Sequence, residues 1–436
     1  MLEIIQPNSI DSIITDPPYE LNFMNKGWDN SGIAFQSDTW KQCYEVLKPG
    51  GYLLAFGGSR TFHRIACAIE DAGFEIRDTI MWLYGEGFPK SHNIGLDIDK
   101  LKGCPDRGHR IAVANRNHPD GTLEPNGEQL EPYKTKTEEA HKWNGWGTAL
   151  KPSYEPIIVA RKPLDGTVAK NCLKWGVGGI NIESCRVGDE NISIHNTPIG
   201  TFAGGEYGRG SDTENYRNNV GRFPANTILT YDETDYKEVC GGFPYTKDYG
   251  GSTKTKPNNN IKFQASKETY INRYNESGSA SRYFYCAKAS KKDRDEGLKD
   301  FQEQKTGSMM ANINGNMQLG GASLKGQLKE IQSKKNIHPT VKPTELMQYL
   351  VRLVSPNGST ILDCFNGSGS TGKAVMYENK ERDSNYKYVG IEITPEYLPI
   401  AKARIEYAIR NNLLPTEEEI EQHADGQTNI FDFIGE

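Results

Sequence analysis

Short apolar runs alternate with segments of helical spacing over the first hundred residues. The runs predict strands, and the positions with a period near 3.6 predict the helices between them. The expected strands are 10–15, 52–56 and 75–83, the expected helices 40–47 and 62–72, and the Lys-Pro-Gly-Gly sequence at 48–51 is expected to be a turn. This alternation predicts an open, mostly parallel sheet with helices on both faces.

The regular pattern then weakens and returns near the end of the chain. Residues 102–148 are polar, and 165–334 are dominated by Gly, Asn, Ser and Thr, with one clear strand between them at 154–160. Strand-like pieces interrupt the second region at 226–230 and 282–287. A stretch this long is not a loop of a compact domain, so an irregular inserted module or partial disorder is expected.

Strand and helix patterns alternate again in the last hundred residues. The expected elements are a helix at 344–354, a strand at 360–363, a helix at 372–378, a strand at 388–391 and a helix at 395–411. Two regular α/β parts around an irregular middle predict one catalytic sheet with an insertion. The expected divisions are 1–162 and 335–412 for the two parts of the catalytic domain, 163–334 for the inserted module, and 413–436 for an acidic tail.

Composition is that of an ordinary globular protein, with 36% hydrophobic and 25% charged residues. No apolar run approaches the ~18 residues of a membrane span, and the amino terminus carries no basic leader, so no secretion signal is expected. The eight cysteines are scattered without a CxxC pair or a Cys/His cluster. We therefore expect no metal site, no disulfide framework and a cytoplasmic location.

The formal net charge of −6 hides an uneven distribution. Residues 254–294 hold ten Lys or Arg and three acids, whereas 416–436 hold seven acids and no Lys or Arg. The basic stretch is either a solvated face or a surface for phosphates, and the acidic tail is expected to be a solvated face.

A glycine-rich turn at 361–375 (ILDCFNGSGSTGKAV) follows a strand and opens a helix. Its span from Gly367 to Lys373 matches a phosphate loop, but Ala374 stands where that loop needs a Mg²⁺-binding hydroxyl, which disfavours a nucleotide triphosphatase. A nucleoside cofactor is the better interpretation. Glu392 ends the next strand, twenty residues after Gly372, where an acid would hold ribose hydroxyls; Asp363 could meet the cofactor's ammonium group.

The sequence TDPPY at 15–19 follows a buried strand directly, which places its side chains at the carboxyl edge of the sheet. Asp16 and the carbonyl of Pro17 offer two acceptors, Pro18 stiffens the turn, and Tyr19 offers a flat ring. This set suits a planar amino group whose two N–H bonds are both accepted while the base stacks on the ring. An ordinary rigid turn with a capping Asp remains the alternative.

Four motifs together resemble the amino-directed DNA methyltransferases. They are TDPPY (15–19), HPTVKP (338–343), LDCFNGSGSTG (362–372) and GIE (390–392). The catalytic motif precedes the cofactor motif, which resembles the permuted order of the family's β group. Three further segments resemble phage and prophage DNA methylases, namely 146–163, 221–229 and 281–297, and this resemblance implies a bacterial or phage-infected host.

The resemblance implies a Rossmann-like sheet of the S-adenosylmethionine-dependent methyltransferases and assigns roles by position. Asp16, Pro17 and Tyr19, with Pro18 in the turn, would bind the flipped base, and Glu392 would bind the ribose of S-adenosylmethionine. The remaining cofactor contacts would come from Thr340, Lys342, Asp363, Phe365, Gly367, Ser368 and Gly369.

The sequence departs from the family at three places. Cys364 and Asn366 replace the usual Pro and Ala of the glycine loop. Family members usually carry a strand with an acidic residue upstream of the DPPY strand, and here that strand begins already at Ile10. We expect either a truncated start or a sheet edge that is built differently.

The implied activity is methylation of N6 of adenine at specific sites in double-stranded DNA, by direct in-line displacement on a flipped base. Such enzymes commonly belong to restriction-modification systems. N4-cytosine methylation is the alternative within the family, and Asp16 favours adenine because Ser is commoner there in the cytosine enzymes. A catalytically silent DNA-binding or anti-restriction protein is a further alternative. The intact motif residues Asp16 and Glu392 argue against it. Monomer and homodimer both remain open.

The tail contains Gln427 followed by Ile430 and Phe431, which resembles the short peptides that dock on bacterial sliding clamps. An acidic segment with an isolated apolar cluster must bury that cluster somewhere. The cluster either docks on a clamp or folds back onto the catalytic sheet.

Overall fold

We describe the protein from a computed structural model. The structure describes residues 3–21, 27–84, 91–104, 134–195, 216–230, 245–246, 278–279, 285–286, 291–302, 304–305 and 333–413. The chain forms two compact units, of which one contains Met1–Leu83 and Tyr154–Glu436 and the other Tyr84–Ser153.

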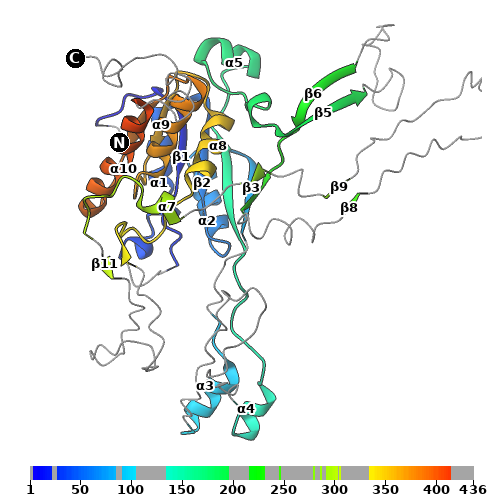
Figure 1. The fold of residues 1–436 in the computed structure, drawn as a ribbon, viewed down its shortest axis with the longest axis vertical. Helices are drawn as coiled ribbons and strands as arrows, with labels where there is room; N and C mark the ends of the chain where they lie inside the picture. Colours follow the sequence, from blue (N-terminus) through cyan, green and yellow to red (C-terminus); the bar gives the residue numbers. More distant parts are fainter. Residues whose placement is uncertain are drawn as a thin grey trace, which may run out of the picture. The chain divides into compact units, whose positions relative to one another are not determined.

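The first unit is built on an eight-stranded sheet in the order β10-β7-β3-β4-β2-β1-β13-β14 (Figure 1). Its strands are β1 (Ile10–Thr15), β2 (Leu47–Phe56), β3 (Glu75–Tyr84), β4 (Tyr154–Arg161), β7 (Thr227–Thr230), β10 (Tyr285–Cys286), β13 (Thr360–Asp363) and β14 (Lys387–Gly390). Strands β2, β1, β13 and β14 are parallel neighbours, as expected from the alternating pattern.

Strand β4 departs from the parallel arrangement, because it runs antiparallel to both of its neighbours, β2 and β3. The registers pair Phe56 with Ile157 on one side and Ile80 with Ile157 on the other. The sheet is therefore mixed, and the amino-terminal end of β4 lies at the edge where the parallel strands end.

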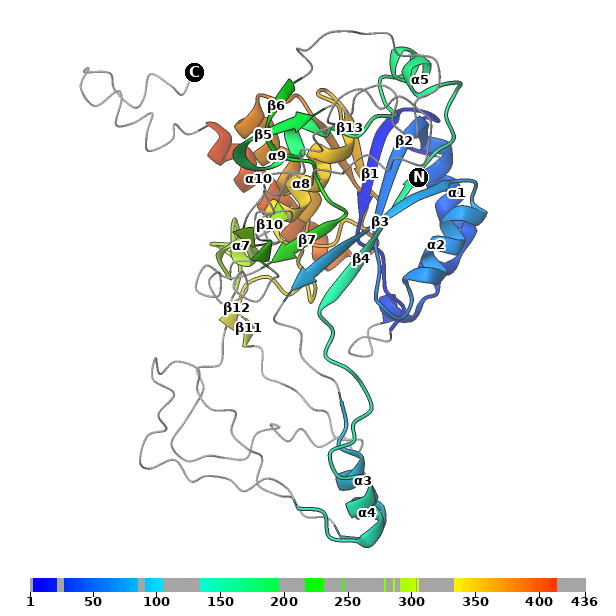
Figure 2. The ribbon, with the colours of Figure 1, turned by 90° about the vertical axis from the view of Figure 1, so that its right-hand side faces the viewer.

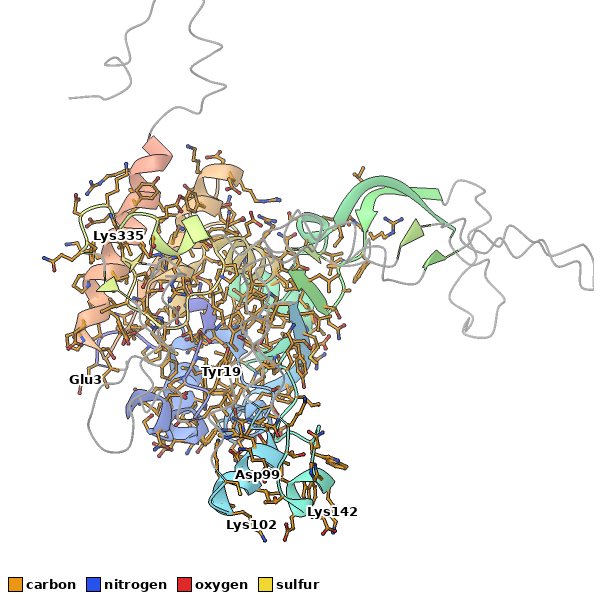
Figure 3. All side chains as sticks on the ribbon, turned by 60° about the horizontal axis from the view of Figure 1, so that its bottom comes forward. Glu3, Tyr19, Asp99, Lys102, Lys142 and Lys335 are labelled. Atoms are coloured by element: carbon orange, nitrogen blue, oxygen red, sulfur yellow. The ribbon has the colours of Figure 1, made fainter. Side chains whose placement is uncertain are left out.

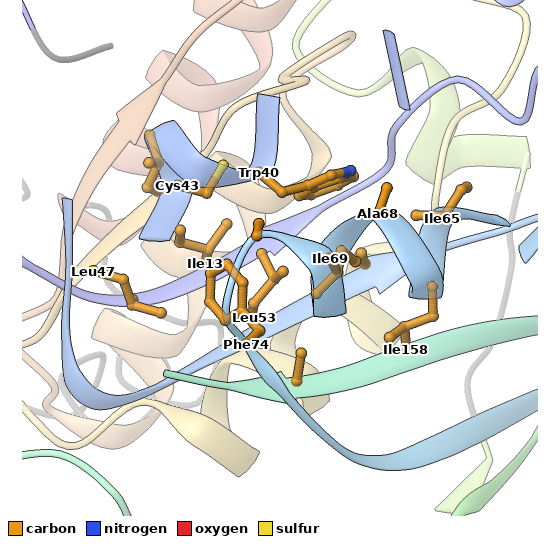
Figure 4. Close-up of a cluster of buried hydrophobic side chains, with 14 of the residues drawn as sticks. Ile13, Trp40, Cys43, Leu47, Leu53, Ile65, Ala68, Ile69, Phe74 and Ile158 are labelled. Carbon is orange, nitrogen blue, oxygen red and sulfur yellow. The ribbon is translucent and has the colours of Figure 1, made fainter. Parts of the chain in front are cut away.

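Helices cover both faces of this sheet (Figure 2). One face carries α1 (Ser37–Val46) and α2 (Phe62–Asp71), and the other carries α8 (Thr344–Val354), α9 (Ser370–Arg382) and α10 (Leu398–Leu413). Under α1 and α2, Trp40, Cys43 and Ile69 pack on Ile13 and Leu53 of the sheet, all of them buried (Figure 4). Burial of large apolar side chains at roughly 1.5–3 kcal/mol each stabilises this layer.

The expected turn at 48–51 is wrong, because these residues belong to β2. Gly50 has a positive φ of 77°, and its amide donates to the carbonyl of Lys162 over 3.0 Å. The pairing of β1 with β2 shifts register between Ile10 and Ser12. The strand thus contains an irregularity that the glycines permit, and it starts earlier than the apolar run.

Several expected elements have the bounds that the pattern gave, including β1, α8 and β13. Between the two regular parts, the structure also contains helices and strands that the pattern did not predict. They are α5 (Val168–Trp175), α7 (Lys291–Asp295), β5 (Val187–His195), β6 (Tyr216–Arg222), β8 (Tyr245–Thr246), β9 (Gly278–Ser279), β11 (Gln304–Lys305) and β12 (Ser333–Lys334).

The region assigned to an insertion, 163–334, contributes β7 and β10 to the catalytic sheet. Much of this region lies outside the described residues, as do Lys254, Lys256, Lys262 and Lys267 and the tail from 414 onward. The domain divisions, the phosphate-binding role of the basic stretch and clamp docking through Gln427 and Phe431 therefore stay predictions.

The second unit pairs α3 (Ile94–Leu101) with α4 (Glu138–Lys142). Asp99 is fully buried between them and accepts from the amides of Lys136 and Thr137 over 2.7 and 2.9 Å (Figure 3). This carboxylate fixes the chain just before α4. Across both units, the helices in the described ranges include none that is long and apolar enough to cross a membrane.

Candidate functional site

The DPPY turn and the glycine loop meet at the carboxyl edge of the sheet. They follow the neighbouring parallel strands β1 and β13, and the hydroxyl of Thr15 donates to Oδ1 of Asp363 over 2.6 Å. Both side chains are buried. The two motifs that sequence analysis assigned to the base and to the cofactor are thus adjacent in space.

Asp16 is held by a lysine from the other end of the chain. Lys342 Nζ donates to Oδ2 of Asp16 over 2.7 Å and lies 3.4 Å from Oε2 of Glu155. Burial lowers the pKa of Lys342, but the charges of Asp16 and Glu155 outweigh it, so this pKa lies above its ordinary value. Oδ1 of Asp16 is buried and accepts no hydrogen bond from any part of the chain that the structure describes.

Tyr19 is fixed at both of its ends. Its hydroxyl donates to Oε2 of Glu155 over 2.7 Å, and its carbonyl accepts from the hydroxyl of Thr61 over 2.7 Å. Burial, assisted by the charges of Asp16 and Glu155, raises the pKa of Tyr19 well above its ordinary value. The phenol therefore stays neutral and keeps its ring in a defined place.

The glycine loop between β13 and α9 depends on two left-handed residues. Gly367 and Gly369 have φ of 52° and 73°, and a Cβ on Gly367 would lie 2.8 Å from Nε2 of His338. At Gly369 a Cβ would lie 2.9 Å from the backbone of Ala401. Both glycines are required for the loop to pack so closely.

Glu392 lies beside this loop and already holds part of it. Its Oε2 accepts from the amide of Gly367 over 2.6 Å, and its Oε1 accepts from the amide of Thr394 over 2.8 Å. Each carboxylate oxygen has two acceptor positions. The remaining ones suit a pair of ribose hydroxyls, so the predicted role of Glu392 fits the geometry.

Both carboxylate oxygens of Asp363 accept hydrogen bonds from other residues of the protein. Oδ1 accepts from Thr15 and from the amide of Phe365, and Oδ2 accepts from the hydroxyl of Thr371 over 2.6 Å. Burial raises its pKa to about 6, and these hydrogen bonds oppose the rise. Asp363 thus organises the loop, while its contact with a cofactor ammonium stays a prediction.

Ser368 is also used inside the protein. Its carbonyl and hydroxyl lie 2.8 and 3.0 Å from Nη1 of Arg404, and both side chains are buried. Phe365 packs at a ring distance of 6.3 Å from Trp40. Thr340 is exposed, and its carbonyl lies 2.7 Å from Nδ1 of His338. Ser368, Phe365 and Thr340 therefore all make contacts within the chain itself.

Lys373 excludes the phosphate-loop interpretation of the same glycines. Its side chain is fully buried, and Nζ lies 2.6 Å from Oδ1 of Asp293 and 2.5 Å from Oε2 of Glu296. A phosphate-loop lysine must reach the phosphates of its ligand. Here two carboxylates of the 291–302 segment hold it behind the loop.

The residues that were expected to form the site are found in two places. The base-binding set from Asp16 to Tyr19 lies at the end of β1, and Gly367, Gly369 and Glu392 lie at the ends of β13 and β14. Lys342 was expected beside the cofactor, and the structure places its ammonium on Asp16.

Sequence analysis missed Glu155, which reaches the same edge because β4 runs antiparallel. Its signals in the sequence were an acid at the start of the otherwise apolar run YEPIIVA and its place in the segment 146–163, which resembles phage and prophage DNA methylases.

A family model described as DNA methylase, with N6- and N4-directed enzymes in its name, matches residues 10–403. The chain belongs to this DNA methylase family. Its recognition from four motifs in the sequence is confirmed, as is the α/β sheet expected for it, whereas the permuted motif order of the β group and the phage-type assignment stay predictions.

Two relatives of this chain are type II methyltransferases. M.HindIII of Haemophilus influenzae is 28% identical over 34% of this chain and 38% of the relative. M.HpaI of Haemophilus parainfluenzae is 35% identical over 23% of this chain and 34% of the relative. The chain thus matches about a third of the length of these relatives.

Among solved structures, the DNA methylase resembles the cytosine-N4-specific PvuII DNA methyltransferase at 13% identity. The likeness covers 100% of this chain and 89% of that one, with a TM-score of 0.37. At this score the likeness assigns no property to the present chain.

Proposed function

We propose that this DNA methylase transfers a methyl group from S-adenosylmethionine to N6 of adenine in double-stranded DNA. One observation carries the proposal. Oδ1 of Asp16 is a buried acceptor without a donor among the described residues, whereas Oδ2 is bound to Lys342. A buried acceptor left unpaired costs about 1–3 kcal/mol. An amino N–H of a bound base would supply the missing donor.

The chain's own residues provide the surroundings that this reaction needs. Tyr19 offers a fixed ring on which a flipped base can stack, and flipping costs a few kcal/mol that such contacts offset. Glu392 keeps acceptor positions for ribose hydroxyls, and the left-handed turns at Gly367 and Gly369 bring the loop backbone close to it. S-adenosylmethionine would supply the electrophilic methyl group. With the acceptors and ring fixed in advance, positioning contributes much of the rate.

The amino group of cytosine at N4 fits the same acceptor, so N4-cytosine methylation is the second candidate. Asp16 at the first motif position supports adenine through the resemblance to adenine enzymes. The proposal also includes site-specific recognition by residues of 163–334, where the basic stretch would contact phosphates.

The test uses the full chain, S-adenosylmethionine with a deuterated methyl group and unmethylated genomic DNA. After digestion to nucleosides, mass spectrometry is expected to find deuterated N6-methyldeoxyadenosine, and the Asp16→Ala variant is expected to give none. Labelled N4-methyldeoxycytidine alone would replace the proposal by the second candidate. Unlabelled DNA would refute methyl transfer altogether. Sequencing of modified bases in the product then gives the recognition sequence.

A further inference from the structure

Glu155 is an acidic residue at the edge of the sheet where the candidate site lies. It belongs to neither the DPPY turn nor the glycine loop. It is the second residue of β4, and the amide of Gly57, just after β2, donates to the carbonyl of the next residue, Pro156, over 2.9 Å. This pairing sets the start of β4 level with the end of β2. The side chain of Glu155 is only 22% exposed and is directed at the DPPY turn through its contacts.

A single oxygen of Glu155 joins the two groups that border the base site. Oε2 accepts from the hydroxyl of Tyr19 over 2.7 Å and lies 3.4 Å from Nζ of Lys342. The same ammonium donates to Asp16 over 2.7 Å. Glu155 therefore fixes the stacking ring directly and Asp16 through Lys342.

The ammonium of Lys342 also lies over two aromatic rings. It is 4.8 Å from the ring centre of Phe56 and 5.3 Å from that of Tyr19. Its side chain is 7% exposed, so the charge is largely removed from water. A cation over a ring face is attracted to it, more strongly where water is excluded. Lys342 thus links Asp16 and Tyr19 by two kinds of contact.

Two carboxylates and one ammonium give the cluster a formal net charge of −1. Breaking a buried ion pair by removing one partner is costly, but replacing the whole pair by apolar residues is often neutral, so stability alone does not require such a cluster. A net negative charge beside the amino nitrogen favours the positive charge that develops there as the methyl group arrives.

We propose that Glu155 and Lys342 are positioning residues of the methyl-transfer site, which hold Asp16 and Tyr19 so that Oδ1 of Asp16 and the tyrosine ring face the target base. This assignment rests on the proposed function, since it concerns the same site. It adds Glu155, a residue of a different strand, to the four motifs that carry the family resemblance.

The first test compares Glu155→Gln, Lys342→Met and Lys342→Arg in the full chain. Glu155→Gln keeps an acceptor for Tyr19 and removes the charge, and Lys342→Arg keeps the charge. We expect kcat to fall by about 100-fold in Glu155→Gln and Lys342→Met, because small misplacements of reacting groups cost rates of this order. The KM for DNA is expected to stay within about threefold in both, and Lys342→Arg is expected to recover part of kcat.

Two matched controls separate positioning from folding. Lys162→Met removes another buried lysine, whose Nζ donates to Asn8 and to the carbonyls of Tyr44 and Leu47. Glu75→Gln removes another strand carboxylate, which pairs with Arg161 over 2.6 Å. Both are expected to lower thermal stability and to leave kcat of the folded fraction unchanged. Equal losses of kcat in the site variants and the controls would overturn the assignment.

The second test needs no turnover. With 3-fluorotyrosine incorporated, the ¹⁹F signal of Tyr19 is identified by its loss in Tyr19→Phe and is followed as pH rises. The carboxylate of Glu155 is one of the charges that raise the pKa of Tyr19. Tyr19 is therefore expected to ionise at lower pH in Glu155→Gln than in the wild type, with no change in Glu75→Gln.

The two tests distinguish failure of the assignment from failure of the proposed function. An unmoved Tyr19 titration, or kcat within about threefold of wild type in both site variants, overturns the positioning role. If the Tyr19 titration shifts in Glu155→Gln but the wild-type protein methylates no DNA, the Glu155 contact is supported and the proposed function is refuted instead.

Discussion

The hydroxyl of Thr15 donates a 2.6 Å hydrogen bond to Oδ1 of Asp363, which joins residues 348 positions apart at the ends of two adjacent strands. The strand that leads into the DPPY turn is thereby tied to the strand that leads into the glycine loop. Because Asp363 also accepts from Thr371 at the start of α9, one carboxylate fixes the spacing between the proposed base site and the proposed cofactor site. Such rigid support is what a reaction between two bound molecules requires.

Asp16→Ala is expected to abolish methylation and to leave the affinity for S-adenosylmethionine within several-fold of wild type. The reason is spatial, since Asp16 borders the base site whereas Glu392 lies at the glycine loop. Methyl transfer to duplex DNA and calorimetric titration with the cofactor measure the two effects separately. Asp38→Ala, which removes an exposed acid paired with Lys41, serves as the control. Near-normal turnover in Asp16→Ala would show that the catalytic assignment is wrong.

Replacing Lys254, Lys256, Lys262 and Lys267 by Gln is expected to weaken DNA binding with little change in site preference. Each phosphate contact that is lost should reduce the slope of log affinity against log salt by about 0.9. The measurement is a binding titration at several salt concentrations on specific and random duplexes. Replacing exposed Lys402 and Arg410 of α10 gives the matched control. An unchanged slope in the fourfold variant would assign these lysines to a solvated face.

The sequence predicted those parts of the fold whose signals are local. The bounds of α8 and β13 followed from a helical stripe and a short apolar run between turn residues. The direction of β4 could not be predicted, because an apolar run carries no information on its partner strands. The β5–β6 pair could not be predicted either, because apolar and polar positions alternate only weakly in its polar sequence.

Within the site, too, residues with a local sequence signal could be predicted, and residues that depend on long-range contacts could not. The DPPY turn and the glycine loop have contiguous signatures, so Asp16, Tyr19 and Gly367 could be found from sequence. Glu155 could not, because its role depends on the antiparallel pairing of β4 and on Lys342 reaching Asp16 from 326 positions away. Long-range contacts between single polar residues leave no periodic pattern.

His338 is expected to make the free energy of unfolding depend on pH. Burial lowers its pKa from 6.5 to about 4, so the unfolded chain binds the proton more tightly than the folded chain. Stability is then lost as pH falls from 6.5 toward 4, by up to about 3 kcal/mol for this group. Asp363, whose pKa is raised to about 6, acts in the opposite direction below pH 6.

Urea unfolding of the wild type and His338→Gln between pH 4.5 and 7.5 checks this expectation. The difference in the free energy of unfolding between the two proteins reports the contribution of His338, because Asp363 contributes equally to both. It is expected to grow in favour of the wild type as pH rises and to level off near pH 7. His63→Gln, which replaces an exposed histidine of α2, is the control. A difference that stays constant over this range would contradict the buried, neutral state of His338.

Asp293→Ala is expected to be the most destabilising of the single substitutions named here. Its carboxylate lies 2.6 Å from the fully buried ammonium of Lys373 and 3.7 Å from the buried guanidinium of Arg404. Burial raises the pKa of Asp293, but Lys373 outweighs it, and the pKa lies below its ordinary value. Removing one partner of a buried ion pair costs about 3–5 kcal/mol when the other charge is left unpaired. Glu296 still lies 2.5 Å from the ammonium of Lys373, so a loss at the lower end of this range is expected.

The effect should reach the glycine loop as well as the stability of the fold. Arg404 contacts Ser368 of that loop, and its Nη2 lies 3.7 Å from Oδ1 of Asp293, a contact that the substitution removes. Loss of the carboxylate is therefore expected to weaken cofactor binding along with stability, as measured by urea unfolding and calorimetry on the same preparation. Glu406→Ala on α10, which breaks two exposed ion pairs, should cost less than about 1 kcal/mol and leave cofactor affinity unchanged. Equal destabilisation by Asp293→Ala and Glu406→Ala would mean that the buried cluster contributes no more than a surface ion pair.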